Sequence, residues 1–230
     1  MRRIVVIIGF AVALSASVGL AGSAAAQTGD AAGFCAARLE ANGAEGKAAN
    51  LAVMAKLVNA APASVAQPMT ALRDAYKKKG DKVFETDSGL ALLSQLDAWV
   101  YDNCPGTQVP VTATDYQFSG VPASLPAGVA KFKLTNSAPK ENHEMVLFKL
   151  NDKGVATDPE KIIAMSQGKA QKLIDHSTQA FMFAAPGTSG YSPIELTPGK
   201  YLYACFVAQA GKKHGEMHAK LGMYGTFAVS

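Results

Sequence analysis

The chain of 230 residues is poor in the residues that build large cofactor sites. It has one tryptophan, three cysteines and four histidines, and no histidine precedes residue 140. The first 140 residues therefore cannot hold a haem through a histidine ligand. Excess charge is also scarce, because the formal net charge is only +4 and is spread along the chain. This distribution argues against a nucleic-acid-binding protein.

Long apolar runs are absent after the first 26 residues. Before that point, Arg2 and Arg3 precede an apolar stretch over 4–20, and three alanines at 24–26 follow it. This order is typical of a secretory signal peptide, so we expect residues 1–26 to be removed. A membrane anchor is the alternative, but the small residues at the end favour cleavage. We therefore expect a secreted or periplasmic protein with no transmembrane segment in the mature chain.

The odd number of cysteines leaves one of them without a partner in an exported protein. Cys35 and Cys104 bracket one segment of the chain, so a disulfide between them is the natural pairing in an oxidising compartment. Cys205 then remains free. It is either a small buried apolar residue or a metal ligand, and its neighbours in the sequence favour the second interpretation.

The spacing of apolar residues changes at Pro105. Before it, the side chains of Leu90, Leu93 and Leu96 recur at helical intervals, and similar spacing runs through residues 31–104. After it, Pro, Gly and Thr become frequent, and runs such as 130–134 alternate apolar with polar residues. We therefore predict an α+β two-domain protein. A small N-terminal helical bundle (31–104) would be followed by an all-β Greek-key sandwich (107–230).

The strongest chemical signal lies near the C-terminus. Cys205, His218 and Met223 follow one another in a loop between two strand-like runs, and His143 begins another such run. A thiolate, two imidazoles and a thioether together suit a soft, redox-active metal ion. A trigonal His/His/Cys site with a weak axial Met is the arrangement of a blue-copper centre.

Four segments resemble the plastocyanin-like, type 1 copper family of cupredoxins: Phe132–Asn136, His143–Phe148, Tyr201–Cys205 and His218–Val229. In that family an Asn-containing strand end precedes the first His ligand, and a Tyr-x-Tyr/Phe-x-Cys strand leads to His, then four residues, then Met. The resemblance covers residues 107–230. It implies a cupredoxin-like fold that holds one copper ion, with His143, Cys205 and His218 as equatorial ligands and Met223 as the axial one.

The chain departs from the family pattern in two places. Twelve residues, 206–217, separate Cys205 from His218, whereas plastocyanin-like proteins have two to four there. Glu144 also stands where the better-known members have Asn. Both features suggest an exported bacterial cupredoxin-like protein with a long Cys-to-His loop. His214 lies inside that loop and is the alternate ligand to His218, although His218 has the spacing to Met223 that the family shows.

The pattern allows three functions. The first is one-electron transfer through a single mononuclear copper site, with a redox partner protein meeting the exposed edge of His218. The second is a copper carrier or storage protein that exchanges copper with a donor or acceptor without redox turnover. The third is a metal-free interaction module on a cupredoxin scaffold. We do not expect an enzyme, because a multicopper oxidase needs further His-rich motifs.

Overall fold

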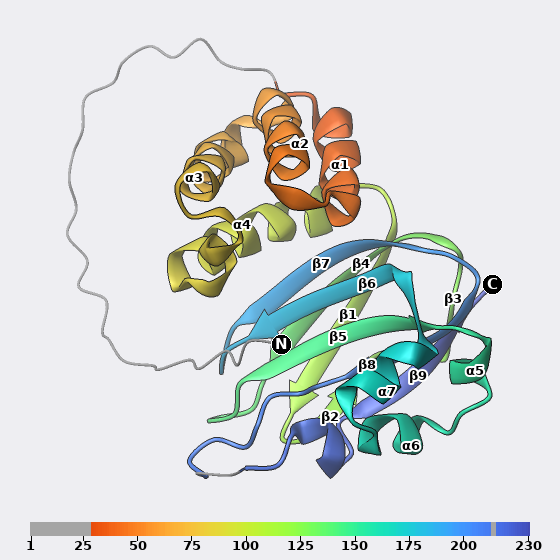
Figure 1. Cartoon of the computed structure of the whole chain (residues 1–230). Coiled ribbons are helices and arrows are strands. Elements are labelled where there is room, and N and C mark those ends of the chain that lie inside the picture. The colour runs from red at the N-terminus through yellow and green to blue at the C-terminus, as the bar shows by residue number, and fades with distance from the viewer. Residues whose placement is uncertain (1–28, 213–214) are drawn as a thin grey trace.

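The chain folds as a helical region followed by a β-sandwich, as the sequence predicts (Figure 1). The structure is a computed structural model, and it describes residues 29–212 and 215–230. The expected signal peptide and His214 lie outside these residues. Among the helices that are described, none is long and apolar enough to cross a membrane.

The helical region comprises four α-helices and two short 3₁₀ turns, the latter over Ala41–Gly43 and Gly80–Glu85. The α-helices are α1 (Ala31–Glu40), α2 (Gly46–Ala60), α3 (Ala63–Lys79) and α4 (Asp87–Asn103). Their apolar faces meet in one core around the fully buried Phe34 and Tyr76. The predicted disulfide is confirmed: Cys35 in α1 is bonded to Cys104 at the end of α4, with the Cα atoms 5.6 Å apart. The bond therefore ties the first helix of the region to the last.

Nine strands within the described residues form two sheets. They are β1 (Thr107–Thr114), β2 (Gln117–Ser119), β3 (Ser124–Leu125), β4 (Gly128–Asn136), β5 (His143–Leu150), β6 (Ile174–Ala184), β7 (Ser189–Leu196), β8 (Gly199–Ala204) and β9 (Tyr224–Val229). The strand orders are β2-β1-β4-β7 and β3-β9-β8-β5-β6. Side chains from both sheets interdigitate in one core that includes Phe132, Leu147 and Phe227. The pairs β1–β4 and β3–β9 are parallel and the others antiparallel.

A group of short helices lies between β5 and β6. These are α5 (Asp152–Val155), α6 (Pro159–Ala164), α7 (Gln167–Ala170) and a 3₁₀ turn over Gln171–Leu173. In Figure 1 they lie beside β8 and β9. Ile162 and Ile163 of α6 pack with Leu202 and Ala204 of β8 in a third apolar cluster. Strand β8 is consequently buried on both faces.

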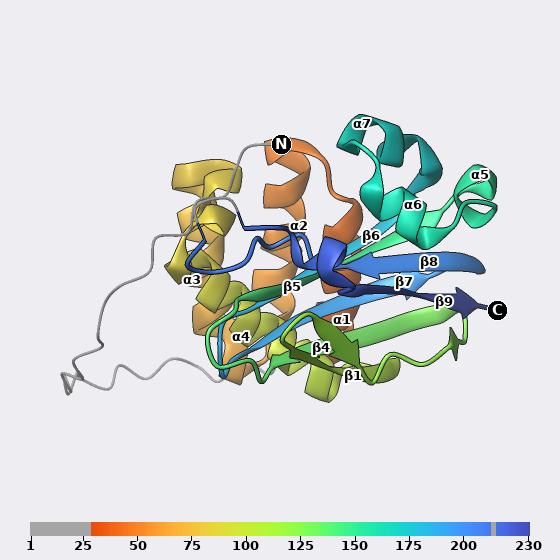
Figure 2. The ribbon, with the colours of Figure 1, turned by 90° about the horizontal axis from the view of Figure 1, so that it is seen from below.

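The helical region packs on the other sheet, over β7 and β4 (Figures 1 and 2). One of the links between them is a lysine of the sheet that reaches the end of a helix. The ammonium of Lys131 in β4 donates to the carbonyls of Tyr101 and Cys104, at the C-terminal end of α4. Carbonyls at a helix C-terminus favour a cation, which helps to accommodate this buried charge. Burial lowers the pKa of Lys131 all the same.

We propose that residues 31–104 and 107–230 are two separate domains. Limited proteolysis tests this division, since Pro105 and Gly106 between them are exposed. We expect early cleavage near these residues and a stable C-terminal fragment. Both bridged cysteines lie on the N-terminal side of the cut, so the disulfide cannot tether the fragments. First cleavage within 120–150, or unfolding of the released sandwich, would contradict the proposal.

Candidate metal centre

Pairing of three neighbouring strands brings three of the predicted ligands together. Ala204 in β8 pairs with Val146 in β5 on one side and with Tyr224 in β9 on the other. When the β8–β9 register is continued by one residue, Cys205 lies opposite Met223. The N–H of Cys205 donates to the carbonyl of Met223 at 3.1 Å. The ligands therefore gather at the end of the sandwich where β5 and β9 begin and β8 ends.

The two-residue period of the strands decides which way these side chains point. In β5, His143, Met145 and Leu147 are fully buried, and the residues between them are partly exposed. The same alternation continues one residue past the end of β8 and places Cys205 in the main core with Tyr201. His143 and Cys205 thus enter the sandwich interior from adjacent strands.

The donor atoms of three side chains converge. Nδ1 of His143 lies 3.2 Å from Nδ1 of His218. Sγ of Cys205 lies 3.4 Å from Nδ1 of His218 and 3.9 Å from Nδ1 of His143. Each of these side chains is 0% exposed. The three residues form a group that could hold one metal ion, with all ligand atoms within 4.8 Å of one another.

Met223 approaches the same place through a sharp turn of the chain. A 3₁₀ turn over His218–Leu221 ends at Gly222, whose φ of 100° is left-handed and suits glycine. The turn brings the N–H of Met223 to the carbonyl of His218, at 3.0 Å. Met223 is fully buried in the same core as Cys205. Its backbone therefore bonds to two of the other three predicted ligands.

The described ends of the long segment between Cys205 and His218 pair with each other as the two strands of a small hairpin do. The N–H of His218 donates to the carbonyl of Val207 at 2.8 Å, and the N–H of Gln209 to that of Glu216 at 3.0 Å. Ala208 and Met217 form an antiparallel bridge between these two bonds. We call residues 208–217 the 208–217 hairpin. Because its two ends pair with each other, Cys205 and His218 are held as close together as a much shorter loop would hold them.

Two carboxylates attach this segment to the site. Oε1 of Glu144, the residue after the first His, accepts from the N–H of Phe206 at 3.1 Å. The N–H of Glu144 points at Sγ of Cys205, 3.5 Å away. Oε2 of Glu141 accepts from the N–H of Ala210, in the hairpin, at 2.9 Å. The departure from the family at Glu144 therefore supplies a contact that fixes the chain next to Cys205.

Asn136, at the end of β4, organises the chain just before His143. Its amide donates to the carbonyls of Glu141, at 2.8 Å, and Ala184, at 2.9 Å, and its oxygen accepts from the N–H of Ala138. The side chain is buried, so these bonds satisfy groups that water does not reach. This Asn is part of the motif quoted above, and its contacts place the loop that carries Glu141.

The expected exposed edge of His218 is not present. His218 and its neighbour Ala219 are both 0% exposed. The ring of Tyr116 meets the imidazole edge-on with the centroids 4.9 Å apart, and Oε2 of Glu141 lies 3.3 Å from its Nε2. Sequence reasoning missed Tyr116 and Glu141. The position of Glu141 two residues before His143 was a signal for one of them, but nothing in the sequence indicated Tyr116.

The site disfavours charge on the ligands when no cation is present. Burial, and then the neighbouring His218, lower the pKa of His143 to about 4. Burial also lowers the pKa of His218, against the opposing effect of Glu141. Burial raises the pKa of the Cys205 thiol to about 12, although the N–H groups of Glu144 and Val207 oppose this. Metal binding at neutral pH must therefore release the thiol proton.

The arrangement fits a bound metal better than a metal-free core. In the described part of the chain, Nε2 of His143 and Nε2 of His218 are buried without a hydrogen bond, and their Nδ1 atoms face each other. Buried polar groups normally have partners. Two imidazoles, one thiol and a thioether form the donor set of a type 1 copper site, so His143, Cys205, His218 and Met223 fit one copper ion.

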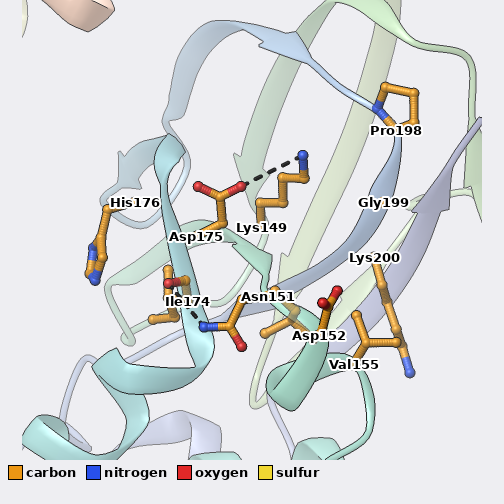
Figure 3. Close-up of a pocket in the computed structure, with 11 residues that line it drawn as sticks. Lys149, Asn151, Asp152, Val155, Ile174, Asp175, His176, Pro198, Gly199 and Lys200 are labelled. Atoms are coloured by element: carbon orange, nitrogen blue, oxygen red, sulfur yellow. Dashed lines mark hydrogen bonds and ion pairs between the residues drawn. The ribbon is translucent and has the colours of Figure 1, made fainter.

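A surface pocket at the other end of the sandwich shares no residue with this site. It lies beside Lys149 and Leu150, at the opposite end of β5 from His143. Figure 3 shows the side chains of Lys149 and Asp175 directed toward each other, with Nζ and Oδ2 3.7 Å apart. No metal-ligand cluster is found there among the described residues. The metal site is therefore not an open pocket but a buried cluster.

Comparison with known proteins finds similar solved structures. Auracyanin B is 27% identical, with a TM-score of 0.37 over 55% of this chain and 90% of that one. Auracyanin A, a "blue" copper protein from Chloroflexus aurantiacus, is 21% identical, with a TM-score of 0.31 over 53% and 99%. Rusticyanin from Thiobacillus ferrooxidans is 19% identical, with a TM-score of 0.34 over 55% and 79%. No family model and no curated protein matches. We therefore assign the metal from the donor set alone.

The metal-free protein should lose stability as the pH falls. The folded state keeps His143 neutral down to about pH 4, whereas the unfolded chain protonates it near the ordinary value of 6.5. Between these values the unfolded state binds more protons, so the free energy of unfolding should fall by roughly 2–3 kcal/mol from pH 6.5 to 4. Urea unfolding of the metal-free protein across this range measures the effect.

Two variants control this measurement. His143→Gln should flatten the pH dependence, while His176→Gln, at an exposed histidine, should leave it unchanged. Equal pH dependence in the wild type and in His143→Gln would show that His143 is not the residue responsible.

Proposed function

We propose that this protein binds one copper ion through His143, Cys205, His218 and Met223 and transfers single electrons to and from a partner protein. The observation that carries the proposal is the convergence of two Nδ1 atoms and one thiol sulfur in a fully buried cluster. Bound copper would supply a Cu(II)/Cu(I) couple. An enzyme is not proposed, because the described residues hold one candidate metal cluster, whereas a multicopper oxidase needs further His-rich motifs.

The residues would have unequal roles. Cys205 would supply the thiolate, the softest and most covalent donor, and the N–H groups of Glu144 and Val207 would stabilise its charge. The imidazoles of His143 and His218 suit both oxidation states. Met223 would be a weak axial ligand that mainly tunes the reduction potential. Because all four side chains are packed in the core, they can keep one geometry through the redox cycle.

Burial of the ligands favours electron transfer over the two other functions. A carrier that exchanges copper needs ligands that a donor or acceptor can reach, but these four are 0% exposed. A metal-free module would leave Nε2 of His143 buried without a partner among the described residues.

Export to the periplasm or outside the cell belongs to the proposal as well. It is supported by the sequence of residues 1–26, which is typical of a signal peptide. The Cys35–Cys104 disulfide agrees with an oxidising compartment.

Ligand variants test the copper site. Cys205→Ser should abolish the intense visible absorption of the copper-loaded protein, because a hydroxyl gives no thiolate charge transfer. Met223→Leu should keep the copper and its colour and shift the reduction potential, since the thioether is a weak axial ligand. Absorption spectroscopy and voltammetry after copper titration measure both. Colour in Cys205→Ser, or none in the wild type, would contradict the proposal.

Replacement of the 208–217 hairpin tests whether the long loop permits the site. A two-residue Asn-Gly turn between Val207 and His218 would keep their existing hydrogen bond, because that turn joins a carbonyl to the N–H three residues on. It would leave four residues between Cys205 and His218. We expect the shortened protein to bind copper with the same type of spectrum.

The same variant also decides between the alternate ligands. The replacement removes His214 and keeps His218. Retention of colour would exclude His214 as a ligand. If this variant loses its colour and His218→Ala keeps it, the second imidazole ligand is His214 and not His218.

A further inference from the structure

Glu141 brings together three segments that are far apart in the sequence. Its Oε1 accepts from the hydroxyl of Tyr116, in the turn between β1 and β2, at 3.3 Å. Its Oε2 accepts from the N–H of Ala210, in the 208–217 hairpin, and lies 3.3 Å from Nε2 of His218. The side chain of Glu141 is only 12% exposed. This carboxylate is therefore a largely buried group that contacts Tyr116, Ala210 and His218.

The hydrogen bonds around Glu141 fix its role as an acceptor. The amide of Gln209 donates to the hydroxyl of Tyr116 at 2.9 Å, so the single proton of that hydroxyl is free to be donated to Glu141. The main-chain N–H of Ala210 can only donate. Both oxygens of Glu141 therefore accept, as an ionised carboxylate does.

The proton of His218 needs such an acceptor. When Nδ1 of a neutral imidazole is a metal ligand, its hydrogen is on Nε2. Ligating histidines usually donate this hydrogen to a carboxylate or carbonyl, which fixes the ring orientation. Nε2 of His218 and Oε2 of Glu141 are at ion-pair distance but not aligned for a hydrogen bond. The ring torsion of histidine is soft, so a ring held at Nδ1 can align them.

The two histidines differ in this respect. Nε2 of His143 is buried with no partner among residues 29–212 and 215–230, whereas Nε2 of His218 faces the carboxylate of Glu141. The charge of Glu141 thus acts more strongly on the imidazole of His218 than on that of His143. A negative charge in a poorly solvated place stabilises the more positive state of a nearby ion.

We propose that Glu141 is a positioning residue for His218: its carboxylate accepts the Nε2 proton, fixes the ring, and lowers the reduction potential by favouring Cu(II) over Cu(I). This role rests on the proposed copper site. The backbone of Tyr116 supports it, because its φ of 60° is unusual for a bulky residue and is kept where the side chain contacts both Glu141 and His218.

The reduction potentials of four copper-loaded proteins test this proposal: the wild type, Glu141→Gln, Glu216→Gln and Tyr116→Phe. Glu141→Gln removes the charge at nearly constant shape. We expect it to weaken Cu(II) binding about tenfold more than Cu(I) binding, which raises the potential by about 59 mV. Glu216→Gln makes the same change of charge at an exposed position of the same hairpin and should have a much smaller effect. Tyr116→Phe keeps the charge but loses one anchor, and should shift the potential upward by less than Glu141→Gln.

A second measurement observes the hydrogen bond itself. In the diamagnetic Cu(I) protein, the Nε2–H signal of His218 should exchange slowly with solvent, as seen by ¹⁵N–¹H NMR. Glu141→Ala, which removes the acceptor, should speed this exchange. A merely structural role for Glu141 would leave the exchange and the potential unchanged as long as the protein stays folded.

The outcomes separate this proposal from the function on which it rests. If Glu141→Gln and Glu216→Gln have equal potentials, Glu141 has no positioning role, although the copper site stands. If Glu141→Gln fails to hold copper, the Tyr116→Phe variant decides. An unchanged reduction potential in Tyr116→Phe overturns the positioning role of Glu141, and a raised potential supports it. If the wild type binds no copper, or binds it without colour, the proposed function and the role of Glu141 are both wrong.

Discussion

The register of three adjacent strands, β5, β8 and β9, is the constraint on which the metal site depends. A slip by one residue would turn His143 and Cys205 from the core to the outer face of the sheet. Burial on both faces of β8 resists such a slip, because Tyr201 packs in the main core and Leu202 under the short helices. The inserted helices therefore stabilise the site without contributing a ligand to it.

The length of the loop between Cys205 and His218 is less of an obstacle than it first suggests. Loop-closure entropy grows slowly, so twelve residues in place of four cost only about 1 kcal/mol more. The hairpin offsets this cost with its own backbone pairs, 207–218 and 209–216, and with the bond from Ala210 to Glu141. Because the ends of the hairpin meet, its length leaves the spacing of the ligands undisturbed.

Much of this organisation could be predicted from local patterns. Alternation in the strands and the Cys-to-Met order predicted the sandwich and the donor set, and the positions of Cys35 and Cys104 at the two ends of one segment predicted the disulfide. The burial of His218 could not be predicted in this way. It depends on Tyr116 and on Gln209, which is 93 residues further along the chain. A contact of that kind appears only after two sheets have packed, and neither residue type signals it by itself.

The faces of the sandwich limit where electrons could cross to a partner. Helices α1 and α4 lie over β7 and β4 on one side, and α5–α7 lie beside β8 and β9 on the other (Figures 1 and 2). At the ligand end, the ring of the half-buried Tyr116 touches that of His218, and its hydroxyl accepts from Gln209 of the hairpin. If the site transfers electrons, one layer of side chains separates His218 from solvent there. The same layer excludes water from the ligands. Burial can therefore tune the reduction potential of the site without blocking electron transfer to a partner.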